Sequence, residues 1–330
     1  MSVFLEIQGL STYFYGGQSV VKAVNGLSLK VLQGETLGIV GESGSGKSVT
    51  ALSILRLVNH PGHIVNGRIL FDGIDLMNIS DKEMRAIRGK RIAMVFQEPM
   101  TSLNPVLTIE RQLSEAIQLH MGVSRDVARK RSIELLEKVG ISDPAMRIND
   151  FPHVLSGGMR QRVMIAMALS CNPDLIIADE PTTAVDVTIQ AQLLELMKKL
   201  TEESGTTLMI ISHNLGLMAR YADRVAIMYA GKIVELGDVF NVFGNPQHPY
   251  TLGLLNSIPR LDKPREDTLN SIMGQPPDLA YLPTGCSFKE RCGYAVERCG
   301  IEAPELMKVN NGHWSACWEI ARLNHSGQGG

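Results

Sequence analysis

A glycine-rich stretch has the composition and spacing of a phosphate-binding loop. The run Gly41-Glu42-Ser43-Gly44-Ser45-Gly46-Lys47-Ser48 fits the pattern G-x-x-x-x-G-K-[ST]. It lies between an expected strand at 36–40 and an expected helix at 49–57, so its backbone N–H groups would point at phosphate oxygens. An accidental Gly-rich turn would lack these flanking elements. The predicted nucleotide-binding residues here are Gly41, Ser43, Gly44, Ser45, Gly46, Lys47, Ser48 and Val49.

Two residues of this loop have specific expected roles. The Lys47 ammonium would bridge the β- and γ-phosphates, and the Ser48 hydroxyl would ligate Mg²⁺. A phosphate loop alone would also suit a kinase, a GTPase or a helicase. Other residues must therefore decide the chemistry.

Two carboxylates end a later apolar run. The sequence Asp174-Leu175-Ile176-Ile177-Ala178-Asp179-Glu180 predicts a strand, along which neighbouring side chains point to opposite faces. We expect Asp179 to contact Mg²⁺ through water and Glu180 to be the base that polarises the attacking water. The alternative is a pair of solvated acids at a strand end. A phosphate loop in the same chain favours the catalytic interpretation.

A second anion-binding helix start is predicted at the run Leu155-Ser156-Gly157-Gly158-Met159-Arg160-Gln161-Arg162. Here Ser156 and two glycines precede a helical pattern expected at 161–168. One nucleotide does not need two such sites within one subunit. We therefore expect Ser156, Gly157 and Gly158 to contact a nucleotide that is shared, head to tail, with a second subunit.

The elements expected around these motifs predict an α/β fold with a mostly parallel central sheet. Short apolar runs predict strands at 36–40, 92–96, 175–178 and 208–211. A helix is expected at 187–199, where apolar residues recur at helical spacing. The dipeptides Asp72-Gly73 and Ala230-Gly231 predict hairpins, and with them an antiparallel layer beside the parallel one.

Composition narrows the classes of protein. The 330 residues are 44% hydrophobic and 20% charged, as in ordinary globular proteins. Lys and Arg total 32 against 34 Asp and Glu, so the net charge of −2 gives no electrostatic footprint for nucleic acid. The apolar runs fall short of the roughly 20 residues that span a bilayer. No secretion signal is visible at the N-terminus, so we expect a cytoplasmic chain with reduced thiols.

The motifs in this order resemble those of the ABC ATPases, whose signature is L-S-G-G-Q or close to it. The resemblance implies that Gln97 contacts Mg²⁺ and water, that His213 is the switch residue at the γ-phosphate, and that Asp186 lies in the dimer-contacting loop of the nucleotide site. Two positions depart from the family pattern: Val185 replaces a common Leu, and Asn214 replaces a frequent Asp. Neither departure removes a catalytic group.

The resemblance also implies the architecture. We expect the ABC ATPase fold, with a phosphate-loop core sheet, an antiparallel β layer and a helical subdomain at about 98–160, all within residues 1–250. A small Cys-rich accessory domain is expected at 251–330. An aromatic residue should stack on adenine. Phe14 is the chosen candidate, with Tyr13 and Tyr15 left open.

Residues 245–251, with the sequence Asn-Pro-Gln-His-Pro-Tyr-Thr, resemble the C-terminal extension of ATPases from bacterial dipeptide and oligopeptide importers, and of their D-type subunit in particular. This implies a heterodimer with a homologous ATPase, two integral membrane permease subunits and a separate solute-binding receptor. The chain would lie peripherally at the cytoplasmic face of the inner membrane. Its cargo would be di- or oligopeptides, or another small solute such as nickel.

Two other classes of function are less well supported. Soluble ABC ATPases of DNA maintenance usually carry long coiled coils or zinc modules between these motifs, and here the insert is compact and lacks sustained heptads. A regulatory nucleotide-binding module without turnover would be expected to lack Glu180, Gln97 or His213. All three are present.

Four of the five cysteines gather near the C-terminus. Cys286, Cys292, Cys299 and Cys317 have the spacing C-x₅-C-x₆-C-x₁₇-C. Four thiolates suit either a zinc ion or a four-iron cluster, and the lack of a tight C-x₂₋₄-C pair slightly favours the cluster. The resemblance to peptide-importer ATPases implies a [4Fe-4S] cluster, with zinc or reduced structural cysteines as alternatives. Cys171 lies in an apolar run and is expected to be a buried small hydrophobe.

Overall fold

The apolar runs form buried strands in the computed structural model. The structure describes residues 2–17, 19–98, 102–181, 187–258, 272–320 and 322. The chain divides into two compact units. Unit 1 comprises Met1–Ser2, Leu32–Thr36 and Asn78–Ile211, and unit 2 comprises Val3–Val31, Leu37–Met77 and Ser212–Gly330. The predicted domain boundary at residue 250 stays a prediction.

The strands of unit 1 form a parallel ladder in the order β6 (Ile92–Val95), β7 (Leu175–Asp179) and β8 (Thr207–Ser212). All five residues of β7 are buried, as expected for a strand that is covered on both faces. The strand predictions are confirmed to within one residue at each end. Parallel pairing brings the carboxyl ends of β6 and β7 to the same edge, and Gln97 and Asp179 lie there.

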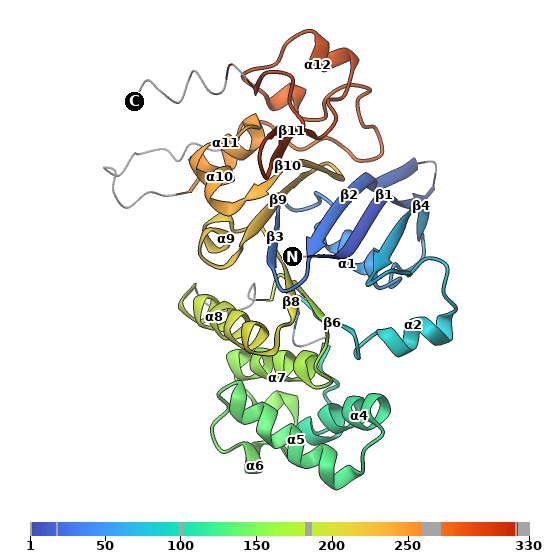
Figure 1. The fold of residues 1–330 in the computed structure, drawn as a ribbon, viewed down its shortest axis with the longest axis vertical. Coiled ribbons are helices and arrows are strands. Elements are labelled where there is room, and N and C mark those ends of the chain that lie inside the picture. The colour runs from blue at the N-terminus through green and yellow to red at the C-terminus, as the bar shows by residue number, and fades with distance from the viewer. Residues whose placement is uncertain are drawn as a thin grey trace. The chain divides into compact units, whose positions relative to one another are not determined.

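The helices α4 to α8 of unit 1 pack against one another, and α2 stands apart from them (Figure 1). The helices are α2 (Asp81–Ile87), α4 (Ile109–Met121), α5 (Arg125–Lys138), α6 (Pro144–Arg147), α7 (Gly157–Leu169) and α8 (Val187–Ser204), with a 3-10 turn at Pro152–Val154. Local signals set their ends: Thr108 and Ser124 cap the N-termini of α4 and α5, and Gly122 ends α4 in the left-handed conformation. The helical insert predicted after residue 98 is therefore present.

One sheet of unit 2 is antiparallel, with the strand order β2-β1-β4-β5. Its strands are β1 (Val3–Gly16), β2 (Ser19–Leu32), β4 (Gly62–Phe71) and β5 (Ile74–Asp75). Asp72 and Gly73 connect β4 to β5, and both have positive φ, as the tight turn of a hairpin requires. This is the antiparallel layer that the sequence predicted.

The second sheet region of unit 2 is mixed. Strand β3 (Thr36–Val40) pairs in parallel with β9 (Arg224–Tyr229), and β9 forms the predicted hairpin with β10 (Lys232–Asp238). The Ala230-Gly231 turn again has positive φ at both residues. The helices of this unit are α1 (Lys47–Ile54), α9 (Leu215–Tyr221), α10 (Val239–Gly244), α11 (Pro249–Asn256) and α12 (Arg298–Ile301), with a 3-10 turn at Lys289–Arg291.

The C-terminal segment joins this sheet instead of standing apart from it. Strand β12 (His313–Ser315) pairs with β10 on one side and with β11 (Met307–Asn310) on the other. The ring Nε2 of His313 lies 2.7 Å from Oε1 of Glu235 in β10, and both side chains are fully buried. Residues 272–320 are thereby tied to the core of unit 2. In the described part of the chain no helix is long and apolar enough to cross a membrane.

Candidate functional site

The glycine-rich loop joins β3 to α1, as the sequence predicted. Gly46 is the N-cap of α1 and has a φ of 102°, which L side chains rarely adopt. At Gly41 a Cβ atom would collide with the backbone carbonyl of Met228, so only glycine fits there. The helix begins at Lys47 and ends at Ile54, where the prediction was 49–57. Arg56 has a φ of 50° and stops the helix early, although the apolar pattern continues.

The interior of this loop presents polar groups. The buried Lys47 ammonium donates to the carbonyl oxygens of Gly41 at 2.8 Å and Glu42 at 3.0 Å. The hydroxyl of Ser45 is buried and has no hydrogen-bond partner among the described residues. A buried unpaired hydroxyl is costly, and a phosphate oxygen would satisfy it. Together with the N-terminus of α1, these groups form a cradle suited to an anion.

The two predicted carboxylates follow one another at the end of β7. Asp179 is the last residue of the strand and is only 6% exposed. Glu180 has a left-handed backbone, with a φ of 44°, which costs a non-glycine residue about 1–2 kcal/mol. Its N–H donates to the carbonyl of Ile211 at 3.0 Å. Such strain is found where the chain must aim a side chain in one direction, and active sites are the common case.

Gln97 and Glu180 are brought together although 83 positions separate them. The Gln97 Nε2 donates to Glu180 Oε2 at 3.1 Å. Both follow adjacent parallel strands, so the contact results from the pairing of β6 with β7. The two residues therefore form one polar pair, which is what a water-positioning role requires. The phosphate loop belongs to unit 2, and this pair belongs to unit 1.

The signature segment places Ser156 at the N-cap of α7, where its hydroxyl accepts from the N–H of Met159 at 3.3 Å. The helix begins at Gly157, four residues before the predicted start at 161, because Ser156 caps it there. Gly157 and Gly158 thus lie in the first helical turn. Within the described part of the chain, no atom would approach a Cβ at Gly157 within 4 Å.

Three further predicted residues lie around these motifs. His213 directly follows β8 and is exposed, and Asn214 caps α9 by accepting from the N–H of Leu217 at 3.3 Å. Asn214 therefore has a structural role in the position where Asp is frequent. Phe14 is half-buried beside Gly62, whereas Tyr13 donates to the Asn25 side chain at 3.0 Å. Asp186 lies outside the described residues.

The four C-terminal cysteines converge. Cys286, Cys292, Cys299 and Cys317 all line one small cavity of about 20 Å³, and none is in a disulfide. Burial raises the pKa of the Cys286 and Cys292 thiols and raises that of Cys317 to about 12. Among the described residues, no three His, Cys, Asp or Glu side chains are arranged to hold a single metal ion. Cys171 is buried elsewhere, as expected.

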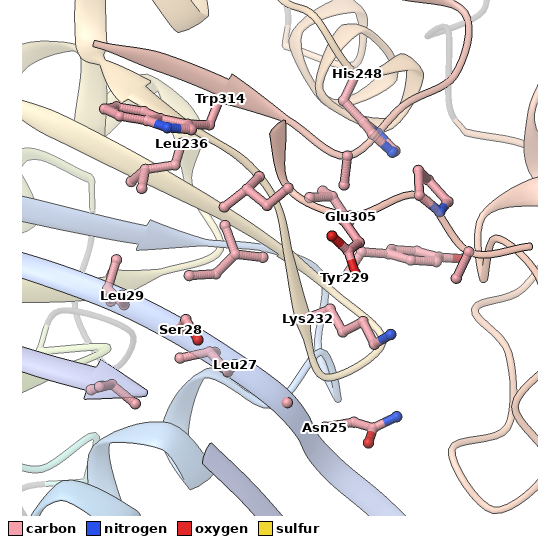
Figure 2. Close-up of a pocket in the computed structure, with 18 of the residues that line it drawn as sticks. Asn25, Leu27, Ser28, Leu29, Tyr229, Lys232, Leu236, His248, Glu305 and Trp314 are labelled. Carbon is pink, nitrogen blue, oxygen red and sulfur yellow. The ribbon is translucent and has the colours of Figure 1, made fainter. Parts of the chain in front are cut away.

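A separate cavity of about 1010 Å³ lies in unit 2 (Figure 2). Its walls come from β2, from the β9–β10 hairpin and from the C-terminal segment, with Asn25, Lys232, His248, Glu305 and Trp314 among the lining residues. Burial lowers the pKa of His248 to about 3, so this histidine is neutral at physiological pH. None of the phosphate-loop residues 41–48 lines this cavity.

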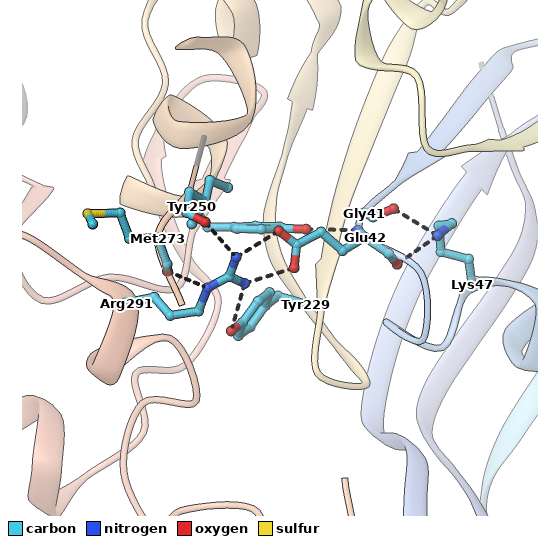
Figure 3. A network of polar contacts seen from close by, with 8 residues as sticks. Gly41, Glu42, Lys47, Tyr229, Tyr250, Met273 and Arg291 are labelled. Atoms are coloured by element: carbon cyan, nitrogen blue, oxygen red, sulfur yellow. Dashed lines mark hydrogen bonds and ion pairs between the residues drawn. The ribbon is translucent and has the colours of Figure 1, made fainter. Parts of the chain in front are cut away.

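The sequence did not predict the network around Glu42 that Figure 3 shows. Arg291 binds the Glu42 carboxylate with both terminal nitrogens, and Tyr250 accepts from the Glu42 N–H at 2.9 Å. The sequence offered one indication that Glu42 has a partner, because an acidic residue in a predicted phosphate-binding loop needs a cation beside it. The sequence could not identify that partner, since 249 positions separate the two residues.

Two family profiles match this chain. Residues 24–183 match "ABC transporter", and residues 234–299 match "Oligopeptide/dipeptide transporter, C-terminal region". The first match includes the phosphate loop, Gln97, the signature and both carboxylates. The second includes three of the four C-terminal cysteines.

Similar proteins align over nearly the whole chain. The dipeptide transport ATP-binding protein DppD of Bacillus subtilis is 50% identical, covering 99% of this chain and 98% of its own length. The oligopeptide transport ATP-binding protein OppD of the same organism is 51% identical, over 95% of this chain and 88% of its own. A structure of the dimeric ATP-binding cassette MJ0796 with ADP and Pi superposes with a TM-score of 0.65 at 29% identity, covering 71% of this chain and 98% of that one.

Proposed function

Since this chain belongs to the ATP-binding subunits of ABC transporters, in the branch with the oligopeptide/dipeptide C-terminal region, we propose that it hydrolyses ATP to power the import of di- and oligopeptides. One observation carries the choice of cargo. Relatives named for peptide transport align with the chain over almost its full length, C-terminal segment included.

The phosphate loop binds the nucleotide in this proposal. Lys47 exchanges its contacts with two loop carbonyls for the β- and γ-phosphates, and the unpartnered Ser45 hydroxyl donates to a phosphate oxygen. Phe14 stacks on adenine. Ser48, Gln97 and Asp179 supply the hard oxygen donors that Mg²⁺ prefers, and the bound ion would neutralise charge on the β- and γ-phosphates.

Glu180 is the proposed catalytic base. Its carboxylate accepts a proton from the attacking water, and the Gln97 side chain, 3.1 Å away, helps to orient both groups. His213 contacts the γ-phosphate. The left-handed backbone of Glu180 supports its role as the base, because a base must be held within hydrogen-bond reach of the water that it activates.

The chain works as one half of an ATPase pair in this proposal. Ser156, Gly157 and Gly158 form a second helix start that binds the nucleotide held by a homologous subunit, and Asp186 contacts that subunit. The dimeric cassette MJ0796, which is similar over 71% of this chain, supports such pairing. The pair attaches to two integral membrane permease subunits at the cytoplasmic face of the inner membrane, and a receptor delivers the peptide to them.

Co-purification tests these partners. The chain, tagged and isolated from mildly solubilised membranes, should bring with it a homologous ATPase and two integral membrane proteins. Alone, the chain should be mostly monomeric and hydrolyse ATP slowly, because its Ser156 site needs a nucleotide from the partner. Recovery of nucleic acid instead of membrane proteins, or a fully active and stable homodimer, would contradict the proposal.

We also propose that Cys286, Cys292, Cys299 and Cys317 hold a [4Fe-4S] cluster. Four free thiols line one cavity, and the donor set suits such a cluster. Each iron of a cluster takes one thiolate, so its ligands stand farther apart than the four ligands of one zinc ion. Among the described residues no group of three or more His, Cys, Asp or Glu side chains is arranged to hold a metal ion, so the four thiols would have to move to bind the cluster. The cavity of about 20 Å³ would have to widen.

Anaerobically purified protein should be brown and contain iron and acid-labile sulfide. Replacing Cys292 by Ser should remove both while ADP binding is retained, because the Cys292 side chain takes no part in the Arg291–Glu42 contact between this segment and the phosphate loop. The matched control is Cys171→Ser, whose site lies in unit 1 and should leave the iron content unchanged. Colourless anaerobic protein with one equivalent of zinc would establish the zinc alternative.

A further inference from the structure

We infer that Arg291, in the cysteine-bearing C-terminal segment, is a positioning residue for the phosphate loop. It fixes the Glu42 carboxylate and cancels its charge, so that the loop can accept an anionic nucleotide. The inference rests on the proposed function, since it assumes that the loop binds ATP. It makes the C-terminal segment part of the nucleotide site.

The contact between the two side chains is bidentate. Arg291 Nη1 lies 2.8 Å from Glu42 Oε2, and Nη2 lies 3.0 Å from Oε1. The arginine side chain is 5% exposed and that of the glutamate 26% exposed. A two-point contact between guanidinium and carboxylate fixes orientation as well as distance, and a partly buried pair is weakly screened by salt.

The guanidinium is itself held in place. Its Nε donates to the carbonyl of Met273 at 3.1 Å, and Nη1 also approaches the Tyr229 hydroxyl at 3.3 Å (Figure 3). The rings of Tyr229 and Phe288 lie 5.8 and 5.9 Å from its central carbon. Because these contacts fix the arginine, the position of Glu42 is set by the C-terminal segment.

Glu42 is fixed through its main chain as well. Its N–H donates to the Tyr250 hydroxyl at 2.9 Å, and its carbonyl accepts from Lys47 at 3.0 Å. Glu42 is therefore held at its side chain, its N–H and its carbonyl. The next residues, Ser43 to Lys47, form the cradle, so the start of the cradle cannot shift unless these three contacts break.

The support for Tyr250 comes from the buried core of unit 2. Tyr250 lies in the first turn of α11, which His248 caps by accepting the Tyr250 N–H at 3.1 Å. The Glu235 carboxylate accepts the N–H groups of Gln247 at 2.6 Å and His248 at 3.0 Å. The start of α11, which carries Tyr250, is thus held against β10 by buried hydrogen bonds.

The Arg291–Glu42 pair also affects the charge of the phosphate loop. A carboxylate in the loop that binds phosphates repels them, and the repulsion is strong in a partly buried site. With Arg291 present, the pair is neutral overall. Without Arg291, no guanidinium would offset the negative charge of the Glu42 carboxylate in this loop.

The test uses the full chain and a fluorescent ADP analogue. Arg291→Gln should weaken ADP binding about tenfold, because one uncompensated negative charge then remains in the loop that binds the phosphates. Adding Glu42→Gln should restore most of the lost affinity, since the repulsive charge is gone. Arg298→Gln is the matched control: this arginine of the same segment is exposed, stacks on Trp318 and pairs with Glu302. It should bind ADP like the wild type.

Unchanged ADP affinity in folded Arg291→Gln would overturn the inference, and so would a double variant as weak as the single one. If Arg291→Gln does not fold, Glu42→Gln alone decides. It leaves a guanidinium without its anion and should bind ADP about threefold more tightly, so weaker binding would overturn the inference. A wild-type chain that fails to bind ADP would instead contradict the proposed function.

Discussion

Replacing Glu180 by Gln should abolish ATP turnover, with a fall in its rate of at least about a hundredfold, and should leave ATP binding intact. The amide has the size of the carboxylate but cannot accept a proton from water. The contact with Gln97 can persist, because the Glu180 side-chain oxygen that accepts from Gln97 Nε2 at 3.1 Å has a counterpart in glutamine. Phosphate release by the assembled ATPase pair measures turnover, and a fluorescent ATP analogue measures binding.

The matched control is Glu203→Gln. Glu203 is an exposed glutamate of α8 that pairs weakly with Lys199 at 3.9 Å, so its loss should not affect hydrolysis. With ATP bound and uncleaved, the Glu180 variant should also remain in the closed pair. Equal rates of phosphate release for Glu180→Gln and wild type would refute the assignment of Glu180 as the base.

Replacing Lys47 by Ala should weaken nucleotide binding itself, by about a hundredfold, because a charge-assisted contact with the phosphates is lost in the ground state too. Removing a buried ammonium that donates to two loop carbonyls also frees the start of the cradle. Titration with ADP and ATP analogues measures the affinity, and circular dichroism checks the fold.

The control for Lys47 is Lys30→Ala. Lys30 is an exposed lysine of β2 paired with Glu6 at 3.1 Å, and its removal should leave nucleotide affinity unchanged. The contrast with Glu180 is informative, because one variant should lose binding and the other turnover. An unchanged affinity in Lys47→Ala would exclude the phosphate-binding role of this lysine.

Local patterns predicted the elements that hold the site. The apolar run 36–40 became β3, and the Asp72-Gly73 and Ala230-Gly231 turns became hairpins, since positive φ at both turn residues is a local requirement. The phosphate loop was predictable for the same reason. Its glycines, its lysine and the start of its helix are adjacent in sequence, so a short motif contains the whole geometry.

Helix ends and long-range partners could not be predicted so well. The apolar pattern suggested that α7 starts at residue 161, yet the Ser156 cap starts it at Gly157. The Gln97–Glu180 contact follows from strand pairing, which an ordered list of strands does not reveal. The Glu42–Arg291 pair joins distant segments through a tertiary fold that brings α11 and the cysteine-bearing segment to the loop.

The central claim is that ATP hydrolysis by this chain is coupled to peptide import. The most direct measurement is the rate of phosphate release by the complex obtained by co-purification, reconstituted in lipid with its receptor, in the presence and absence of a dipeptide. We predict that the dipeptide raises the rate several-fold in the wild-type complex and has no effect when this chain carries Glu180→Gln. Stimulation by Ni²⁺ but not by peptides would contradict the account.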